Sequence, residues 1–266
     1  DADFRSVTIS KSKSGKFFVS ILVKQQIELL PSAGKVIGLD MGLADLFTSS
    51  SGVKVDNPRW FRKNQAKLAK VQRNLSRKQK GSNRYNKQRI KVSKVHEKTA
   101  NQRKHFTHIM STALVREFDV IITEDLNVAG MKKALNLGKS VSDANWSEFI
   151  RQLEYKCGWY GKSFVKIDRF YASSQICSSC GHKDGKKSLD VREWTCSKCG
   201  VEHDRDFNAA LNILFKGYSD LTGLTFEESS AELVDYRRGE DVRLGDMIDR
   251  HLAASVKRLD KFIDLS

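Results

Sequence analysis

Three acidic residues lie where a strand or a helix is expected to begin or end, and carboxylates at such positions can hold metal ions. Asp40 closes the apolar run "KVIGLD", and Glu124 closes "FDVIITE". The third acid is Asp206 or Asp204, both in "HDRDFNAALNIL". Taken singly, each acid is more simply explained as a turn or capping residue. Taken together, they could share two Mg²⁺ ions about 3.5–4 Å apart, which activate water and stabilise the leaving oxygen of a phosphodiester.

Helix geometry favours Asp206 over Asp204 as the third acid. A helix that begins near Asp206 places this residue on one face with two alanines, Ala209 and Ala210. The alanines allow that face to approach a sheet closely, so we expect Asp206 to point toward the strand ends. Asp204 lies before the helix, where it could cap the turn or close the cysteine module, and it remains the alternative.

Four of the five cysteines form two C-x-x-C pairs, each followed by a glycine. The four are Cys177, Cys180, Cys196 and Cys199. Two such turns bring four sulfurs into a tetrahedron, the arrangement of closed structural zinc sites, so we expect one structural zinc ion with no open position for water. His182 and His203 could compete as ligands. The remaining cysteine, Cys157, is expected to be a buried core thiol.

The positive charge of the chain is concentrated in one segment. The formal net charge is +15, and 17 of the 47 Lys and Arg residues fall between Arg59 and Lys104, together with one acid, Glu97. Charge that is segregated in this way indicates a polyanionic partner, of which nucleic acid is the usual one. A merely solvated charged face is the alternative. The candidate nucleic-acid-binding residues are Arg59, Arg62, Lys63, Lys67, Lys70, Arg73, Arg77, Lys78, Lys80, Arg84, Lys87, Arg89, Lys91 and Lys94.

The hydrophobic periodicity predicts the elements that must position these residues. Alternation with period two predicts strands, and spacings of three and four predict helices. The basic segment is expected to form an antiparallel helical hairpin over about residues 57–117, broken at "KGSNRY". The expected strands are 17–23, 35–39, 44–48, 53–55, 118–126 and 163–168, and the other expected helices are 146–161, one from about 206, and one around 252–262.

Several motifs in fixed order resemble a known family. They are "GLDMGLADL", "IITEDLNVAGM", "SDANWSEFIRQLEYKCGWYG", "YASSQICSSCG", "REWTCSKCGVEHDRDFNAALNIL" and "ELVDYRRGEDVRLG", and they cover most of residues 34–245. Together they resemble the RuvC-like core of the TnpB (OrfB) proteins, transposon-encoded RNA-guided DNA endonucleases related to the type V CRISPR effectors. The resemblance implies an α/β fold, an RNase H-like (RuvC) mixed sheet with an inserted basic helical hairpin and an inserted zinc ribbon.

The resemblance also implies roles for single residues. Asp40 and Glu124 match the first and second catalytic acids, and Asp206, the second aspartate of "DRDFNAALNI", matches the third. Each is then both a catalytic residue and a magnesium ligand. Two catalytic magnesium ions and one structural zinc ion are implied as cofactors, with guide RNA and target DNA as partners. No membrane association and no small-molecule substrate are expected, and the implied location is the prokaryotic cytosol or nucleoid.

The resemblance divides the chain into segments. Family members carry an N-terminal half that recognises the guide scaffold and the motif beside the target, and little of the chain before residue 34 matches it, so we expect a fragment or a truncated product. The expected segments are 1–33, remnant of an N-terminal β-domain; 34–171, RuvC-like core with the hairpin insertion; 172–203, zinc ribbon; 204–218, last RuvC segment with the third acid; and 219–266, a C-terminal tail.

Two other functions remain open at the level of sequence. A chain of this kind could bind nucleic acid without cutting it, as a guided repressor or a truncated transposon remnant. It could also be a transposase that joins DNA ends through the same acids, because RNase H-like folds support both hydrolysis and strand transfer. The acid set favours metal-dependent cleavage, and the resemblance to the TnpB proteins implies that this cleavage is RNA-guided and acts on DNA.

Overall fold

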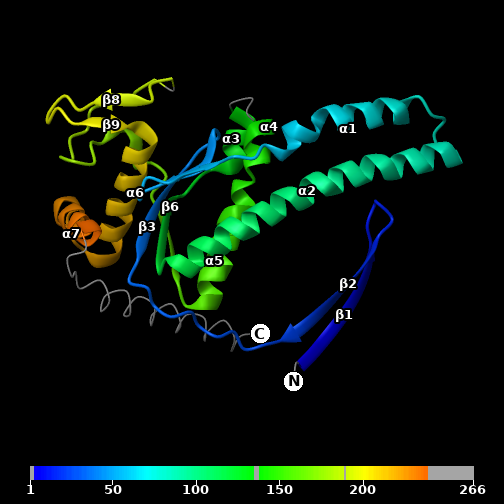
Figure 1. Ribbon diagram of the computed structural model, residues 1–266, viewed down its shortest axis with the longest axis horizontal. Helices are drawn as coiled ribbons and strands as arrows, with labels where there is room; N and C mark the ends of the chain where they lie inside the picture. The colour runs from blue at the N-terminus through cyan, green and yellow to red at the C-terminus, as the bar shows by residue number, and fades with distance from the viewer. Residues whose placement is uncertain (1–2, 135–137, 189, 239–266) are drawn as a thin grey trace. The chain divides into compact units, whose positions relative to one another are not determined.

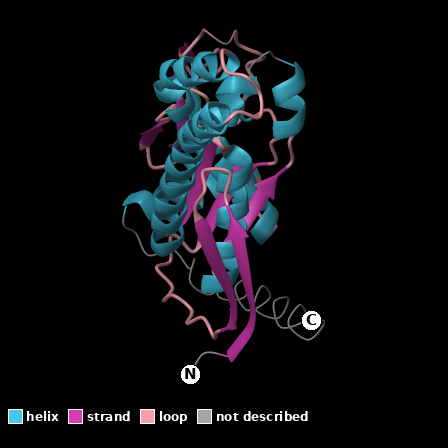
Figure 2. Ribbon diagram, turned by 90° about the vertical axis from the view of Figure 1, so that its right-hand side faces the viewer, coloured by secondary structure: helices cyan, strands magenta, loops and turns pink. Residues whose placement is uncertain are grey.

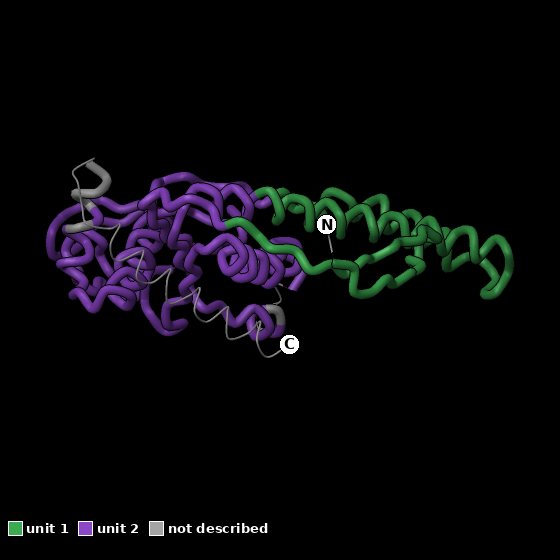
Figure 3. Tube along the Cα trace, turned by 90° about the horizontal axis from the view of Figure 1, so that it is seen from below, with its two compact units in different colours: residues 1–28, 58–109 green, residues 29–57, 110–266 purple. Residues whose placement is uncertain are grey.

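The computed structural model describes residues 3–134, 138–188 and 190–238. The helix expected around residues 252–262 lies outside these residues. The chain divides into two compact units, one of residues 1–28 and 58–109 and the other of residues 29–57 and 110–266 (Figure 3). No helix in the described ranges combines the length and the apolar character that crossing a membrane requires.

The first unit combines a β-hairpin with most of a helical hairpin. Strands β1 (Asp3–Lys11) and β2 (Phe17–Lys24) pair antiparallel, and every residue in them is exposed. The turn between them is held against α2 (Asn83–Glu117), because Lys16 pairs with Glu97 at 3.2 Å. Glu97, the single acid of the basic segment, therefore fastens the two hairpins together.

The basic helical hairpin is present, as the fold class predicted. The side chain of Asn64 in α1 (Trp60–Ser76) donates to Gln102 Oε1 at 2.9 Å, and Gln88 donates to the carbonyl of Val71 at 3.0 Å. The earlier residue of α1, Asn64, contacts the later residue of α2, Gln102, and the later residue of α1 contacts the earlier residue of α2. The two helices therefore run antiparallel. The helices are separated at residues 77–82, slightly earlier than expected.

A five-stranded mixed sheet forms the centre of the second unit (Figures 1 and 2). The strand order is β5-β4-β3-β6-β7; β3 pairs antiparallel with β4 and parallel with β6, and β7 runs parallel to β6. This confirms the expected α/β class with a mixed sheet. The strands are β3 (Val36–Met41), β4 (Asp45–Ser49), β5 (Lys54–Asp56), β6 (Val120–Glu124) and β7 (Ser163–Ile167).

Helices cover both faces of this sheet (Figure 1). Helix α6 (Arg205–Thr222) packs on one face, and α5 (Trp146–Tyr160) lies on the other, where Phe149 stacks on Phe47 with ring centroids 5.8 Å apart. Two short helices that the sequence did not predict, α3 (Val128–Ala134) and α4 (Gly138–Ala144), precede α5.

The packing of α6 on β3 is unusually close. A Cβ atom placed on Gly38 would lie 2.5 Å from the carbonyl oxygen of Ala210 and 2.7 Å from the amide nitrogen of Leu214. The small residues on both sides therefore allow two backbones to touch, as the alanines of the helix predicted. The position of α6 against the sheet is consequently fixed by main-chain atoms.

The last described elements extend the core and form a small module. Helix α6 continues to Thr222, beyond the expected segment end at residue 218, and α7 (Phe226–Arg238) packs on it, with the ring of Phe226 edge-on to Phe215 at 5.5 Å. The described part of the expected tail thus belongs to the core. The cysteine module contains the two-stranded pair β8 (Glu193–Thr195) and β9 (Glu202–Asp204).

A buried ion pair fastens the chain segment that enters the sheet. The carboxylate of Asp119 pairs with the ammonium of Lys162, and the side chains are 0% and 1% exposed. Asp119 also accepts hydrogen bonds from the amide of Ala33 at 2.8 Å and from the hydroxyl of Ser32 at 3.0 Å. Lys162 donates to the carbonyl of Pro31 at 2.7 Å. The pair therefore holds residues 31–33 as well as its own two segments.

Replacing Asp119 with Ala should destabilise the protein by about 3–5 kcal/mol, because the ammonium of Lys162 would remain buried without its counter-charge. Chemical denaturation monitored by circular dichroism measures this change. The exposed pair of Asp125 with Arg169 provides the control, since Asp125→Ala should change stability by less than about 1 kcal/mol. Equal effects of the two substitutions would contradict the structural role assigned to Asp119.

Candidate functional site

The alternation of side chains along the strands brings two acids to the same face of the sheet. Gly38 of β3 faces α6, so Asp40, two residues further on, faces the same side. Ile122 of β6 packs in the cluster formed with α6, so Glu124 also faces that side. The parallel register pairs Leu39 with Thr123, and hence places Asp40 and Glu124 next to each other at the carboxyl ends of adjacent strands.

The start of α6 supplies the third acid. Asp204 is the N-cap residue, and its Oδ1 accepts a hydrogen bond from the amide of Phe207 at 2.9 Å. Its other oxygen lies 2.6 Å from the ammonium of Lys54 on β5. Asp206 lies in the first turn, with its side chain 26% exposed, and pairs with Arg192 at 3.2 Å. Asp204 therefore caps the helix, which was one of the two roles expected for it, whereas Asp206 does not.

Electrostatics shows that these acids share one site. Burial raises the pKa of Asp40 well above its usual value, and the charges of Glu124, Asp206 and, less strongly, Asp204 raise it further, whereas Arg205 lowers it. Burial also raises the pKa of Glu124, partly offset by a hydrogen bond from Ser173. A carboxylate whose pKa is raised lies in surroundings that do not neutralise its negative charge, and a bound cation could do so. Carboxylate oxygens are ligands that Mg²⁺ prefers.

Asp204 differs from Asp40 and Glu124 in the direction of its pKa shift. Although burial opposes the change, hydrogen bonds from the Lys54 ammonium and from the backbone amide of Phe207 lower the pKa of Asp204. Lys54 thus balances the charge of Asp204, as Arg192 does for Asp206. The charges of Glu124, Asp206 and Asp204 all act on Asp40, so these acids lie near one edge of the sheet.

Sequence reasoning missed the partners of these acids. Lys54 is 150 residues from Asp204, and the hydroxyl of Ser173 that contacts Glu124 is 49 residues from it. Arg192 reaches Asp206 from the loop before β8. Neither spacing nor periodicity marks such contacts, although the serine lies in the motif "YASSQICSSCG".

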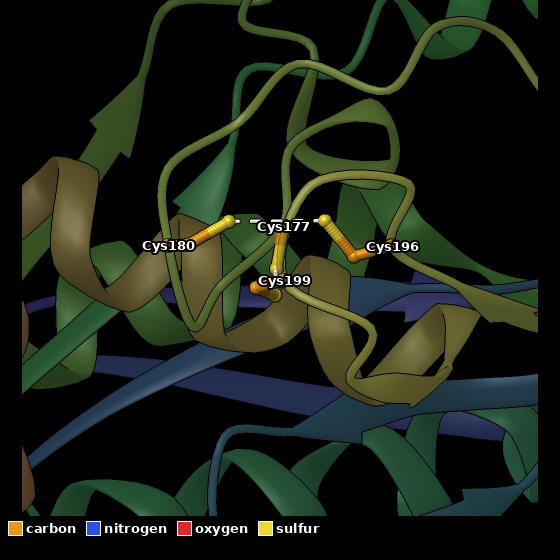
Figure 4. Close-up of side chains that lie close together, drawn as sticks. All are labelled: Cys177, Cys180, Cys196 and Cys199. Carbon is orange, nitrogen blue, oxygen red and sulfur yellow. Dashed lines mark hydrogen bonds between the residues drawn. The ribbon is translucent and has the colours of Figure 1, made fainter.

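The four cysteines come together as predicted (Figure 4). Their sulfur atoms all lie within 4.8 Å of one another, with Cys177 and Cys199 3.6 Å apart and Cys180 and Cys196 3.7 Å apart. A tetrahedral zinc ion with bonds of about 2.3 Å requires sulfurs about 3.8 Å apart, so the spacing fits. Within the described ranges, these four cysteines are the one group of three or more His, Cys, Asp or Glu residues whose ligand atoms all lie within 4.8 Å of one another. The cluster could therefore bind a metal ion such as zinc.

Each cysteine pair is built on the same backbone turn. The amide of Gly181 donates to the carbonyl of Cys177, and that of Gly200 to the carbonyl of Cys196, both at 2.9 Å. Both glycines have positive φ, +69° and +74°, which a side chain would disfavour. Hydrogen bonds from the backbone at Cys199 lower the pKa of Cys196 to about 7, which favours the thiolate that binds metals.

The two histidines of the module behave differently. Nε2 of His203 lies 3.0 Å from the sulfur of Cys177, and its ring packs on Trp194 with the ring centroids 4.8 Å apart. Nε2 of His182 instead lies 3.9 Å from the carboxylate of Asp184. The four-sulfur group is complete without either ring.

Ten of the fourteen basic candidates lie on α1 or α2, and the other four, Arg59, Arg77, Lys78 and Lys80, lie at the helix ends or between the helices. Thirteen of the fourteen candidates are exposed, and Lys78 is half-buried. Within α1, Lys63, Lys67 and Lys70 follow a spacing of four and three, and therefore share one face of the helix.

The remaining cysteine, Cys157, is buried as predicted, and burial raises the pKa of its thiol to about 12.

Two family models match the chain. One, described as "Probable transposase", matches residues 20–135, and the other, described as "Cas12f1-like, TNB domain", matches residues 146–213. The chain is 46% identical over 216 residues to a "Putative RNA-guided DNA endonuclease" of Streptomyces pristinaespiralis, covering 81% of this chain and 54% of that protein. It is 36% identical over 234 residues to "Putative RNA-guided DNA endonuclease InsQ" of Escherichia coli (strain K12), covering 82% and 58%.

A solved structure has the same fold. A chain of the cryo-EM structure of the Cas12f1–sgRNA–target DNA complex matches 78% of this chain and 55% of its own length, with a TM-score of 0.51 and 19% identity. The likeness shows a shared α/β fold, and a RuvC-like core is consistent with it. The chain spans rather more than half the length of the two curated relatives. With both family models and these relatives in agreement, the chain belongs to the TnpB (OrfB) family.

Proposed function

We propose that this chain is the catalytic core of an RNA-guided, Mg²⁺-dependent DNA endonuclease. The observation that carries the proposal is the convergence of Asp40, Glu124 and Asp206 on one edge of the sheet, where burial and their mutual repulsion raise the pKa of Asp40. Relatives named as RNA-guided DNA endonucleases support the choice of reaction.

The three acids act as ligands for two magnesium ions. Magnesium bound there supplies an activated water and stabilises the leaving oxygen of the phosphodiester. Asp40, on which the charges of both other acids act, would be one of these ligands. Glu124 and Asp206 complete the set from the neighbouring strand and from α6. Asp204 keeps its structural roles, as cap of α6 and partner of Lys54.

The four cysteines hold one structural zinc ion. Four sulfur ligands leave no position open for water, so this ion folds the module of about residues 172–203 and takes no part in the chemistry. Guide RNA and target DNA are the proposed partners of the protein, and the basic helical hairpin, about residues 57–117, is their proposed contact surface.

Paired substitutions at the start of α6 test the nuclease assignment. Asp206→Asn should reduce guided cleavage of a matched DNA by about a thousandfold, because losing a metal ligand removes several kcal/mol of transition-state stabilisation. Asp204→Asn should retain cutting, since Asn caps a helix about as well as Asp. A gel assay of cleavage, with the protein, its guide RNA and Mg²⁺ or EDTA, measures both.

Each alternative outcome has its own meaning in this assay. If Asp204→Asn abolishes cutting and Asp206→Asn does not, the third acid is misassigned. If wild-type protein binds the guided target without cutting it in Mg²⁺, the non-cleaving function is favoured. Joined DNA ends among the products would favour strand transfer.

The salt dependence of RNA binding tests the basic hairpin. The logarithm of the affinity for guide RNA should fall linearly with the logarithm of salt concentration. Lys63→Ala, Lys67→Ala and Lys70→Ala together should make the slope shallower by about 0.7–0.9 for each phosphate that the variant no longer neutralises. Fluorescence polarisation at several salt concentrations gives the slope. Lys35→Ala, outside the hairpin, is the control. An unchanged slope in the triple variant would exclude this face of α1 as a binding surface.

A further inference from the structure

A buried serine contacts the second acid of the site. Ser173 belongs to a short 3-10 helix, η1 (Ser173–Gln175), and is 5% exposed. Its hydroxyl is hydrogen-bonded to Oε1 of Glu124. An ionised carboxylate only accepts hydrogen bonds, so the hydroxyl is the donor whenever Glu124 is charged. One oxygen of Glu124 is thereby fixed, which sets the direction in which the other oxygen points.

The serine is in turn held from α6. Asn212 is fully buried, and its Nδ2 donates to the carbonyl of Ser173 at 2.8 Å and to the carbonyl of Ile176 at 2.6 Å. Four residues earlier, Asn208 donates to the same Ile176 carbonyl at 2.8 Å and accepts from the amide of Ser178 at 2.9 Å. Two buried amides on consecutive turns of α6 thus clamp this segment to the helix.

We propose that Ser173 is a positioning residue for Glu124, and that Asn212 sets the position of Ser173 from α6. The inference rests on the proposed metal-dependent nuclease function. One helix then places two of the three acids, Asp206 directly and Glu124 through the serine. Hydrogen-bond partners that orient metal ligands typically account for about 10–100-fold in metal affinity or activity.

The clamp also lies next to the cysteine module. Ile176, whose carbonyl accepts from both asparagines, directly precedes Cys177, and Ser178 directly follows it. The segment that orients Glu124 therefore continues without interruption into the first cysteine turn. The hydroxyl of Ser173 contacts Glu124, one of the proposed metal ligands, and this contact is what distinguishes a positioning role from a purely structural one.

Two matched pairs of side chains at position 173 test the proposal. Ser with Ala, and Thr with Val, each compare a hydroxyl with a side chain of similar volume that lacks it. Mn²⁺ binding to zinc-loaded protein, titrated by electron paramagnetic resonance, gives the metal affinity. Ser173→Ala and Ser173→Val should weaken Mn²⁺ binding by about tenfold or more and slow guided cleavage, and Ser173→Thr should stay close to wild type.

Ser163→Ala is the matched control. Ser163 is buried, like Ser173, but it lies on β7 of the five-stranded sheet. Its hydroxyl oxygen has no hydrogen-bond partner among the described residues. If Ser173→Ala and Ser173→Val bind Mn²⁺ as tightly as Ser163→Ala does, the positioning role is wrong. If Ser173→Ala does not fold, the Thr and Val variants, which fill the space, decide the question.

A separate variant distinguishes failure of this proposal from failure of the proposed function. Glu124→Gln removes the acid itself. If Glu124→Gln binds Mn²⁺ and cuts DNA like wild type, the nuclease assignment of Glu124 fails, whatever the serine does. If Glu124→Gln is inactive while Ser173→Ala and Ser173→Val are unaffected, the function stands and the positioning role falls. Unchanged zinc content and thermal unfolding in each variant show that the fold is retained.

Discussion

Asp40→Asn should abolish guided DNA cleavage and also stabilise the Mg²⁺-free protein. The loss of cleavage, about a thousandfold or more, follows from removing one of the proposed metal ligands. The gain in stability follows from the repulsion among the acids, since burial and the charges of Glu124 and Asp206 raise the pKa of Asp40. Thermal unfolding of the zinc-loaded protein without Mg²⁺ should shift upward by about 2–4 °C for each kcal/mol of repulsion relieved.

The same electrostatics fixes the sign of the pH dependence. A carboxyl whose pKa is higher in the folded than in the unfolded state destabilises the fold when it is ionised. Mg²⁺-free wild-type protein should therefore gain stability from Asp40 as the pH falls through the raised folded-state pKa toward the unfolded-state value, and Asp40→Asn should lack this gain. Mg²⁺ should stabilise wild type more than the variant, because a ligand stabilises the state that binds it.

Asp220→Asn provides the control for both measurements. Asp220 lies on α6 in an exposed pair with Lys216, so the same chemical change is made outside the acid site. It should leave cleavage unchanged and should not raise the unfolding temperature of the zinc-loaded protein without Mg²⁺. If Asp40→Asn instead destabilises the Mg²⁺-free protein, the carboxylate is structural and the electrostatic account of the site is wrong.

Cys196→Ser should release the zinc ion and unfold the cysteine module while the sheet remains folded. Zinc-finger peptides gain about 10–16 kcal/mol of apparent free energy from structural zinc, far more than a module of this size gains from its small core. Elemental analysis measures the zinc content. Hydrogen exchange measures protection of residues 172–203 and, for comparison, of β6.

Cys157→Ala is the matched cysteine control. Cys157 is buried outside the cluster and remains a thiol, because burial raises its pKa to about 12. Zinc content should stay at one ion per chain in this variant. A Cys196→Ser protein that loses zinc but keeps full protection in residues 172–203 would show that the metal does not fold the module.

The elements that the sequence predicted well are those with a local signal. The strands that end in Asp40 and Glu124 are short apolar runs, and the parity of their side chains already places both acids on one face. The cysteine cluster followed from residue type and spacing alone. The start of α6 was placed within a residue, so the comparison of Asp204 with Asp206 could be made from helix geometry.

The interactions that the sequence could not predict join distant segments. Lys54 neutralises Asp204 only because β5 forms the edge of the sheet near the start of α6. The β-hairpin of residues 3–24 joins the helical hairpin in one unit through Lys16 and Glu97, and no periodicity within either segment indicates that pairing. Helix α7 was missed because its apolar residues are few. Such features depend on tertiary packing, which local patterns do not encode.

The backbone approach between Gly38 and Ala210 acts as a fixed spacer for the nuclease site. Side chains in a core can repack when a neighbour changes, whereas two main chains that touch have no such freedom. The separation between the acid on β3 and the acid on α6 is therefore insulated from substitutions elsewhere in the core. A side chain at position 38 would collide with the main chain of α6 and so change this separation directly.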